Sequence, residues 1–267
     1  MASFSVVSNI SSANAQANLI ATNIGLNKAL TRLSSGFRIN YAGDDAAGLA
    51  VANAYRNDLA IINQGIRNAN DGLSTLQIKD GALNNISTLL DRLATLATQA
   101  ASGETSDASR ATLDQEFQDV LNEITRESTV AGLQSSTGFS VFVSNNGANG
   151  KITGTIAGAS VASLNLSGTA LTTQTDAEAA VAAVASAVTL LGQAQSTIGV
   201  LQNRLQFAIS LAQSQVVNNK AAESRIRDAN IAEETANMTR FNILSQSGIA
   251  ALAQANQTSA SVLSLLR

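Results

Sequence analysis

The amino-acid sequence predicts a mainly α-helical fold, an elongated antiparallel coiled-coil bundle of long N- and C-terminal helices with a small β-hairpin insert. Apolar residues recur at alternating spacings of three and four in both flanks of the chain, which is the pattern of one helical stripe. The chain contains no Pro, so no residue forces its helices to break. Between the flanks, the only charged residue from Ser128 to Thr175 is Lys151, and glycines are frequent there. This change in composition marks the insert.

The first periodic segment lies near the N-terminus and is a stripe of leucines with Asn23 in its gap. The adjacent Asp44 and Asp45 precede the next segment. Neighbouring residues on a helix point about 100° apart, so the pair does not converge on a metal ion or a proton, and Asp is favourable at a helix start. We therefore predict that Asp44 and Asp45 cap a helix. The leucine stripe consists of Leu19, Leu26, Leu30 and Leu33.

The second predicted helix ends at Ser102-Gly103 and carries two apolar stripes that meet at Asp80-Gly81. The second stripe is out of register with the first, which predicts a stammer that overwinds the coil. Ser106 or Asp107 is predicted to cap a shorter helix. The stripes are Leu59, Ile62, Ile66, Ala69, Leu73 and Leu76, then Leu83, Ile86, Leu90, Leu93 and Ala97, and the shorter helix has an apolar face of Leu113, Phe117, Val120 and Ile124.

The insert, around 137–175, is predicted to hold the β-hairpin. Phe139, Val141 and Val143 alternate with polar residues, a turn-rich SNNGANG follows, and Ile152 and Ile156 continue the alternation. Thr175 and Glu178 then have the spacing of a capping box, which predicts the start of a long helix. Its weakly polar run 179–192 is shorter than the roughly 18 to 20 residues of a membrane span, so we interpret it as a buried amphipathic helix with no membrane partner.

The C-terminal segment repeats at threes and fours from Met238 to Leu266, and neither terminal stripe has a partner nearby in sequence. Pairing the two ends antiparallel covers one stripe of each, and other copies of the chain would cover the rest. This predicts an inner coiled-coil domain of 1–42 and 228–267, and a helical bundle domain of 43–227 that carries the hairpin. The predicted self-assembly residues are Leu19, Leu26, Leu30, Leu33, Phe241, Leu252, Val262 and Leu266.

Composition excludes many functions. The chain has no His and no Cys, which removes thiolate and imidazole catalysis and ordinary zinc, haem or iron–sulfur sites. No cofactor is predicted. A net charge of −3 and 3% aromatic residues argue against a nucleic-acid partner. The N-terminus lacks the basic start and apolar core of a cleaved signal, so classical signal-directed export is not expected.

Several strings along the chain resemble the bacterial flagellins, over roughly residues 1–135 and 180–267. The resemblance implies a structural subunit that polymerises into the extracellular flagellar filament for swimming motility. In the string SRIRDANIAEE, the residues Arg225, Arg227 and Asp228 are interpreted as an ion-pair cluster between helices or subunits. The strings are LSSGFRIN (33–40), DDAAGLA (44–50), NANDGLS (68–74), SRIRDANIAEE (224–234) and TRFNILSQSGIAALAQANQ (239–257).

The resemblance also implies partners and a route of secretion. Flagellins are exported unfolded through the flagellum's type III apparatus with a chaperone on the C-terminal helix, and they contact cap and hook-associated proteins. An innate immune receptor reads positions that match Arg92, Leu96 and Glu116. Ala94 and Thr95 replace the Arg and Glu of the strongly recognised pattern, so we expect receptor recognition to be weakened or absent.

Three alternatives differ from a filament subunit in what they require of the sequence. A hook–filament junction protein shares the terminal helices, but the LSSGFRIN and SRIRD strings favour the filament subunit. A secreted membrane-active translocator also uses coiled coils, yet it needs long apolar segments that the sequence lacks. An enzyme needs positioned titratable groups, and the insert has one charged residue.

Overall fold

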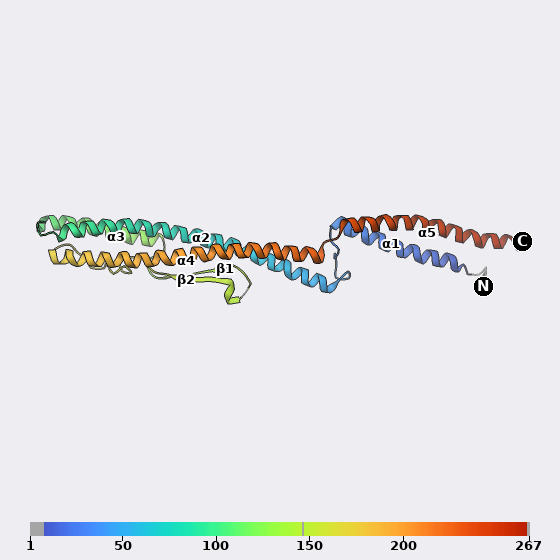
Figure 1. The fold of residues 1–267 in the computed structure, drawn as a ribbon, viewed down its shortest axis with the longest axis horizontal. Helices are drawn as coiled ribbons and strands as arrows, with labels where there is room; N and C mark the ends of the chain where they lie inside the picture. The colour runs from blue at the N-terminus through green and yellow to red at the C-terminus, as the bar shows by residue number, and fades with distance from the viewer. Residues whose placement is uncertain (1–7, 146, 266–267) are drawn as a thin grey trace. The chain divides into compact units, whose positions relative to one another are not determined.

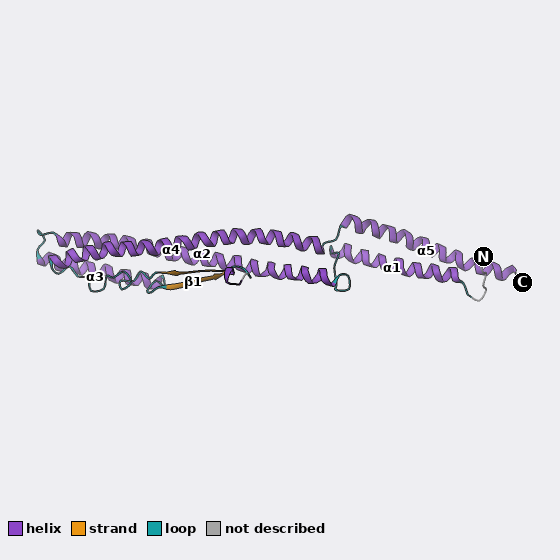
Figure 2. Cartoon of the chain, turned by 60° about the horizontal axis from the view of Figure 1, so that its bottom comes forward, coloured by secondary structure: helices purple, strands orange, loops and turns teal. Residues whose placement is uncertain are grey.

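A computed structural model describes the backbone of residues 8–145 and 147–265, and the side chains of these residues except 148 and 258–265. Helices dominate this part of the chain, with one antiparallel hairpin as its sheet (Figure 2). The mainly α fold with a small β-hairpin is therefore confirmed. The elements are α1 (Ile10–Ser35), α2 (Ala46–Ala101), α3 (Asp107–Val130), β1 (Thr137–Phe142), the 3-10 turn η1 (Gly147–Gly150), β2 (Lys151–Ile156), α4 (Gln174–Arg227) and α5 (Ile231–Leu265).

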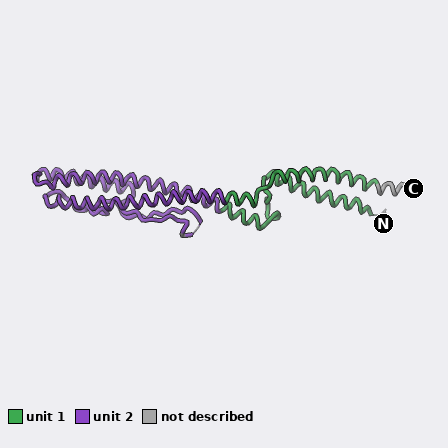
Figure 3. Tube along the Cα trace, in the orientation of Figure 1, with its two compact units in different colours: residues 1–57, 219–267 green, residues 58–218 purple. Residues whose placement is uncertain are grey.

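The chain forms two compact units (Figure 3). We call residues 1–57 with 219–267 the terminal unit, and residues 58–218 the hairpin unit. The boundaries between them lie within α2 and α4. The predicted division at residues 42 and 228 lies instead at the breaks in the helices, and as a functional division it stays a prediction.

The buried side of α2 follows an unbroken seven-residue repeat, so the predicted stammer is wrong. Ile66 and Leu73, which the sequence placed on the stripe, are half-buried beside it. Gly65 and Gly72 occupy the buried positions, because a Cβ at Gly65 would lie 1.8 Å from the carbonyl oxygen of Val143. Glycine thus makes room for the hairpin. The two buried rows are Ile62, Ala69, Leu76, Leu83, Leu90 and Ala97, and Gly65, Gly72, Lys79, Ile86, Leu93 and Ala100.

The hairpin packs one face on the helices of the hairpin unit. Val141 pairs with Ile152 across the strands, and both side chains are buried. Gly154 faces α4, where a Cβ would lie 2.7 Å from a methyl carbon of Leu201. The alternation that predicted the hairpin is confirmed by this burial. After β2 the insert continues without strands to α4, and it buries Leu164, Leu166 and Leu171.

Helix caps test the predicted starts directly. The Ser106 hydroxyl accepts from the amide of Ser109 at 3.3 Å, so the predicted cap of α3 is confirmed. Asp45 caps α2 by accepting from the amide of Gly48 at 2.9 Å. The predicted Thr175 cap of α4 is wrong, because Thr173 accepts from the amide of Asp176 at 3.1 Å. The Thr173 hydroxyl donates to the Asp176 carboxylate at 2.7 Å. Thr173 and Asp176 thus form the cap with the spacing predicted for Thr175 and Glu178, two residues earlier in the chain.

Helix α4 passes a length and composition test for a membrane span, with an 18-residue window of mean hydropathy 1.4. A core helix of a protein in water passes the same test. Ala180, Val184, Ala187 and Leu191 of α4 are buried in the hairpin unit. The interpretation of residues 179–192 as a buried amphipathic helix is therefore confirmed.

Candidate self-assembly surface

Helices α1 and α5 lie side by side and antiparallel, and we call this pair the terminal coil (Figure 1). At one end the side-chain amide of Asn9 donates to the carbonyl oxygen of Ala255 at 2.8 Å. At the other end Arg32 pairs with Glu234 at 2.9 Å. Residue numbers rise along one helix as they fall along the other. The predicted antiparallel pairing of the two chain ends is therefore confirmed.

The seam of the terminal coil is the line where its two helices meet. The Phe241 ring lies over Gly25, where a Cβ would come within 2.7 Å of it. Leu19 similarly approaches Gly248, at 3.2 Å from a Cβ placed there. Small residues thus accept the large side chains of the opposite helix. The half-buried seam residues are Leu19, Leu26 and Leu33 on α1, and Met238, Phe241, Ser245, Gly248, Leu252 and Ala255 on α5.

The predicted self-assembly residues divide into three groups. Leu19, Leu26, Leu33, Phe241 and Leu252 lie on the seam and contact the chain's own second helix. Leu30 is different, because it is 44% exposed on the outside of α1. The last two predicted residues, Val262 and Leu266, lie outside the residues whose side chains the structure describes.

The outside of the terminal coil carries large apolar residues that the stripe analysis missed. Ile24 is 64% exposed on α1, and Ile243 is 60% exposed on α5. Residues 1–27 and 241–266 contain no Asp, Glu, Lys or Arg, and this lack of charge was the sequence signal that could have revealed the surface. We call the exposed apolar residues the outer face: Ile10, Ile20, Ile24 and Leu30 of α1, and Ile231, Ile243, Leu244 and Ile249 of α5.

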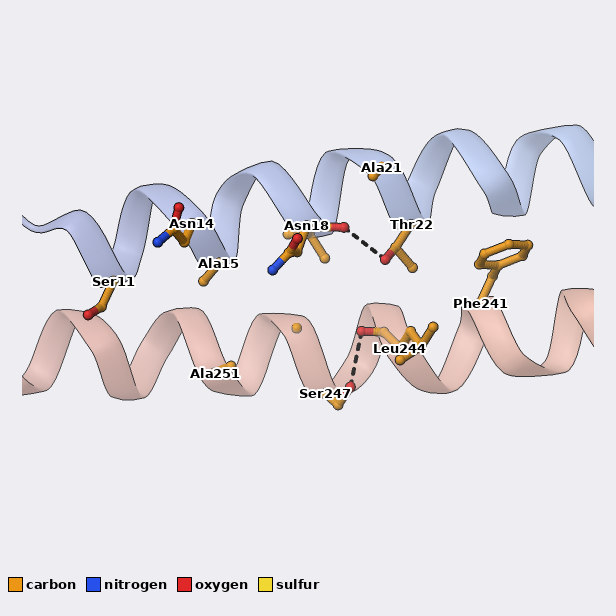
Figure 4. A pocket seen from close by; sticks show the side chains of 12 residues that line it. Ser11, Asn14, Ala15, Asn18, Ala21, Thr22, Phe241, Leu244, Ser247 and Ala251 are labelled. Carbon is orange, nitrogen blue, oxygen red and sulfur yellow. Dashed lines mark hydrogen bonds between the residues drawn. The ribbon is translucent and has the colours of Figure 1, made fainter.

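A groove of about 780 Å³ runs along the terminal coil and is lined by α1 and α5 (Figure 4). The Thr22 hydroxyl donates to the carbonyl oxygen of Asn18 at 2.8 Å, and the Ser247 hydroxyl donates to that of Leu244 at 3.1 Å. These hydroxyls are satisfied within their own helices. Covering the groove with protein therefore leaves these two donors paired, which lowers the cost of burying them.

The two chain passages next to the terminal coil are tied together, and we call residues 36–38 with 227–229 the clamp. The amide of Arg38 donates to the carbonyl oxygen of Arg227 at 2.7 Å, and the amide of Ala229 donates to that of Gly36 at 2.9 Å. The Arg227 guanidinium lies 4.2 Å from the ring centroid of Phe37. These contacts join the strings LSSGFRIN and SRIRDANIAEE, which are far apart in sequence. Of the predicted ion-pair cluster, the described residues form one long pair within α4, Arg227 with Glu223 at 3.9 Å, and pairing between subunits stays a prediction.

Asp44 is held beside the clamp by cations of α1. Its carboxylate lies 3.0 Å from the ammonium of Lys28, and its side chain is 4% exposed. Burial opposes ionisation of Asp44, but the hydrogen bonds from Lys28 and the Asn40 amide, with the charges of Lys28 and Arg32, lower its pKa. Asp44 is thus an ion-pair residue, and Asp45 alone caps α2. Within the described residues no group of three acidic, His or Cys side chains could hold a metal ion.

The three receptor-type positions lie in the hairpin unit and differ in accessibility. Arg92 and Glu116 pair through the Arg92 Nε at 2.8 Å, and their side chains are 55% and 44% exposed. Leu96 is 2% exposed and belongs to the core. Only the ion pair of this set reaches the surface of the described unit.

Comparisons with known proteins agree with the geometry. The profile of the bacterial flagellin N-terminal helical region matches residues 6–132, and that of the C-terminal helical region matches residues 181–266. A flagellin of Halalkalibacterium halodurans is 36% identical over 92% of this chain and 95% of its own length. Flagellin FlaB1 of Treponema pallidum is 33% identical over 97% of this chain and 98% of its own.

A solved structure from Vibrio parahaemolyticus, described as a "putative flagellar hook-associated protein", aligns with a TM-score of 0.55. The alignment covers 69% of this chain and all of that chain, at 13% identity. At this identity the likeness concerns the fold alone.

Proposed function

The chain belongs to the bacterial flagellins, which are filament structural subunits and not enzymes, and from this we propose that the outer face of its terminal coil makes the contacts between copies in the filament. Flagellins polymerise into the extracellular flagellar filament. The observation that carries the proposal is a two-helix coil without charge over most of its length that leaves eight large apolar side chains exposed. Large exposed apolar residues gathered on one helix pair indicate a protein contact site.

The seam and the outer face have different roles in this proposal. The seam holds α1 against α5 and so shapes the coil, through Leu19, Leu26, Leu33, Phe241 and Leu252. Leu30 and the outer-face isoleucines then pack against neighbouring copies. The division 1–42 and 228–267 corresponds to the filament core in this view, and 43–227 to the domain around it.

We also propose an export chaperone, a cap protein and hook-associated proteins as partners, and secretion of this chain to the outside of the cell. Support comes from α5, where Ile243, Leu244 and Ile249 are exposed in the isolated chain. Such residues associate with the wrong partner unless another protein covers them before assembly. The chaperone would cover α5, and the filament would take its place.

Innate-receptor recognition is proposed to be weak. The Arg92–Glu116 pair is accessible, but each charge already has a partner in the other, and Leu96 lies in the core. A reporter-cell assay with purified monomer tests this, and full potency would contradict it.

The filament role of the outer face is tested by Ile24→Asp. Residue 24 is 64% exposed, so the monomer should keep its far-UV circular dichroism, while burying an unpaired carboxylate between copies costs several kcal/mol. We expect no polymerisation in light scattering and no filaments in negative stain. Ile78→Asp, at a 69% exposed isoleucine outside the terminal coil, is the matched control and should polymerise. Normal filaments from Ile24→Asp would sink the proposal.

A further inference from the structure

Helix α4 carries a second exposed apolar surface, in the hairpin unit. Phe207 is 77% exposed, the highest value among the large apolar residues of the described chain, and Val200 and Leu211 are 54% and 61% exposed. Spacings of seven and four place these three residues on one side of the helix. Leu201, Leu205 and Ala212 lie about 80° or more around the helix from these residues and are buried. We call Val200, Arg204, Phe207 and Leu211 the α4 stripe.

Arg204 gives the α4 stripe a positive charge. It is the only charged residue between 179 and 219, and it lies three positions before Phe207. One of its terminal nitrogens donates to the carbonyl oxygen of Thr153 at 3.2 Å. None of the ion pairs in the described part of the chain involves Arg204, so its charge is not neutralised by a carboxylate there.

Helix α3 of the same unit presents a surface of opposite charge. Six of its residues are acidic and two are basic, and on its outer side Glu116 pairs with Arg92 and Glu123 with Arg126. Asp119 is exposed and takes part in none of the described ion pairs, and Val130 at the end of the helix is 74% exposed. Repeats of three and four place these residues on one outer side of α3. We call Glu116, Asp119, Glu123, Arg126 and Val130 the α3 stripe.

We propose that the α4 stripe of one copy docks on the α3 stripe of the next copy in the filament, with Arg204 beside Asp119. The inference rests on the proposed self-assembly. A filament requires contacts between two different surfaces of the same chain, because a contact between identical surfaces closes into a dimer. The two stripes meet this need, since both carry exposed apolar residues, and Arg204 and Asp119 are opposite charges that take part in none of the described ion pairs.

The charges of this contact supply what the terminal coil lacks. The coil is uncharged over residues 1–27 and 241–266, and apolar contact alone is not directional. A shift that brings like charges together is penalised, whereas a pair of opposite charges favours the register in which the two charges meet. The α4–α3 contact therefore fixes the position of each copy against the next, and the terminal coil supplies most of the apolar contact.

The proposal is tested by polymerisation of full-length variants, followed by sedimentation to give the monomer concentration left at equilibrium. Phe207→Ser and Leu211→Ser should raise that concentration about tenfold each, as at centres of interfaces. Val188→Ser is the matched control, because Val188 is 42% exposed on another side of α4. Circular dichroism and thermal unfolding should show unchanged monomers, since the stripe side chains are exposed.

The pairing itself is tested by charge reversal. Arg204→Glu and Asp119→Lys should each impair polymerisation, less at high salt than at low salt, and the double variant should restore it. Arg204 also contacts Thr153, so Arg204→Gln serves as a second variant that removes the charge without reversing it. The monomer concentration that Arg204→Gln leaves at equilibrium should lie between those of the wild-type chain and Arg204→Glu.

Each outcome decides between the proposals. If the wild-type chain does not polymerise, the proposed function fails as a whole. If the wild-type chain and all stripe variants polymerise alike, only the α4 stripe contact is overturned, and the stripe serves another partner or none. If stripe variants block assembly but Asp119→Lys does not rescue Arg204→Glu, the assignment of α3 as the docking surface is overturned.

Discussion

The hairpin unit and the terminal coil are both built from long helices with a three-and-four repeat, yet they bury very different amounts of their side chains. In the hairpin unit, residues such as Leu83, Leu90 and Phe117 have no exposed surface. In the described part of the coil, Ala29 at 2% and Glu234 at 7% are the residues that count as buried. The hairpin, α3 and the rest of the insert cover α2 and α4, whereas α1 and α5 pack on each other with no further layer of helices or strands among the described residues. Periodicity alone therefore makes a helix pair, and additional layers make a core.

The largest expected effect comes from removing a ring in each region. Phe117→Ala in the hairpin unit should lower the free energy of unfolding by about 3–5 kcal/mol, because it leaves a cavity in a closed core. Phe241→Ala in the coil should lower it by about 1 kcal/mol, since that ring is half-exposed. Urea unfolding of the monomers by circular dichroism measures both. Equal losses would show that the coil is as well packed as the hairpin unit.

A smaller effect is expected where the hairpin meets α2. Gly65→Ala places a methyl group 1.8 Å from the Val143 carbonyl oxygen, so the hairpin must move, at a cost of about 1–3 kcal/mol. Gly81→Ala in the same helix meets nothing within 4 Å and should stabilise by up to about 1 kcal/mol through helix propensity. Thermal unfolding of the two variants checks the opposite signs. A stabilised Gly65→Ala would mean that the hairpin does not rest on α2.

The smallest effects are those of pH, and the two regions should respond at opposite ends of the scale. The pKa of Asp44 in the terminal unit lies below its ordinary 3.8, because its hydrogen bonds from Lys28 and Asn40 outweigh burial. Its contribution is therefore present above pH 3.8 and is lost as the pH falls through the lowered pKa. The Asp44→Asn variant should therefore have a lower free energy of unfolding than the wild-type chain at neutral pH. In acid the two values should converge, as measured by urea unfolding across the pH range.

Lys79 in the hairpin unit responds at the alkaline end of the pH scale. Burial lowers its pKa from 10.5, and its ammonium donates to the carbonyl oxygen of Gly132 at 3.3 Å. Lys79→Met should be more stable than the wild-type chain at neutral pH, because the wild-type chain buries a charge. The Gly132 oxygen keeps the Thr137 hydroxyl as a donor. The gap should close as the pH rises toward 10.5, and a gap independent of pH would assign the effect to packing alone.

Much of this fold follows from the sequence because helical stripes, caps and hairpin alternation are local patterns. The Ser106 cap and the Val141–Ile152 hairpin were predictable on that basis. The seven-residue repeat of α2 was not, because Gly65, Gly72 and Lys79 occupy buried positions that a search for apolar residues passes over. Gly65 and Gly72 are buried against Val143 and Val141, which lie more than sixty residues away in sequence.

The candidate surface was predictable in part, for a related reason. The seam residues of α5 follow the stripe from Met238 to Ala255, as the sequence predicts. Ile24, Ile243 and Ile249 are out of phase with it, and a stripe search treats residues out of phase as background. The distinction between seam and outer face needs the partner helix. The contacts of the clamp are backbone hydrogen bonds between distant strings, which side-chain patterns do not encode.

The clamp has a mechanical consequence. A rotating filament loads its subunits, and a pull on one of two unconnected chain passages would be carried by that passage alone. Here the amides of Arg38 and Ala229 join the outgoing and returning passages, so tension on either one is shared by both. Because these hydrogen bonds use main-chain atoms, side-chain changes at residues 38 and 229 leave the clamp in place. Gly36, with a φ of +75°, is the residue at which substitution strains it.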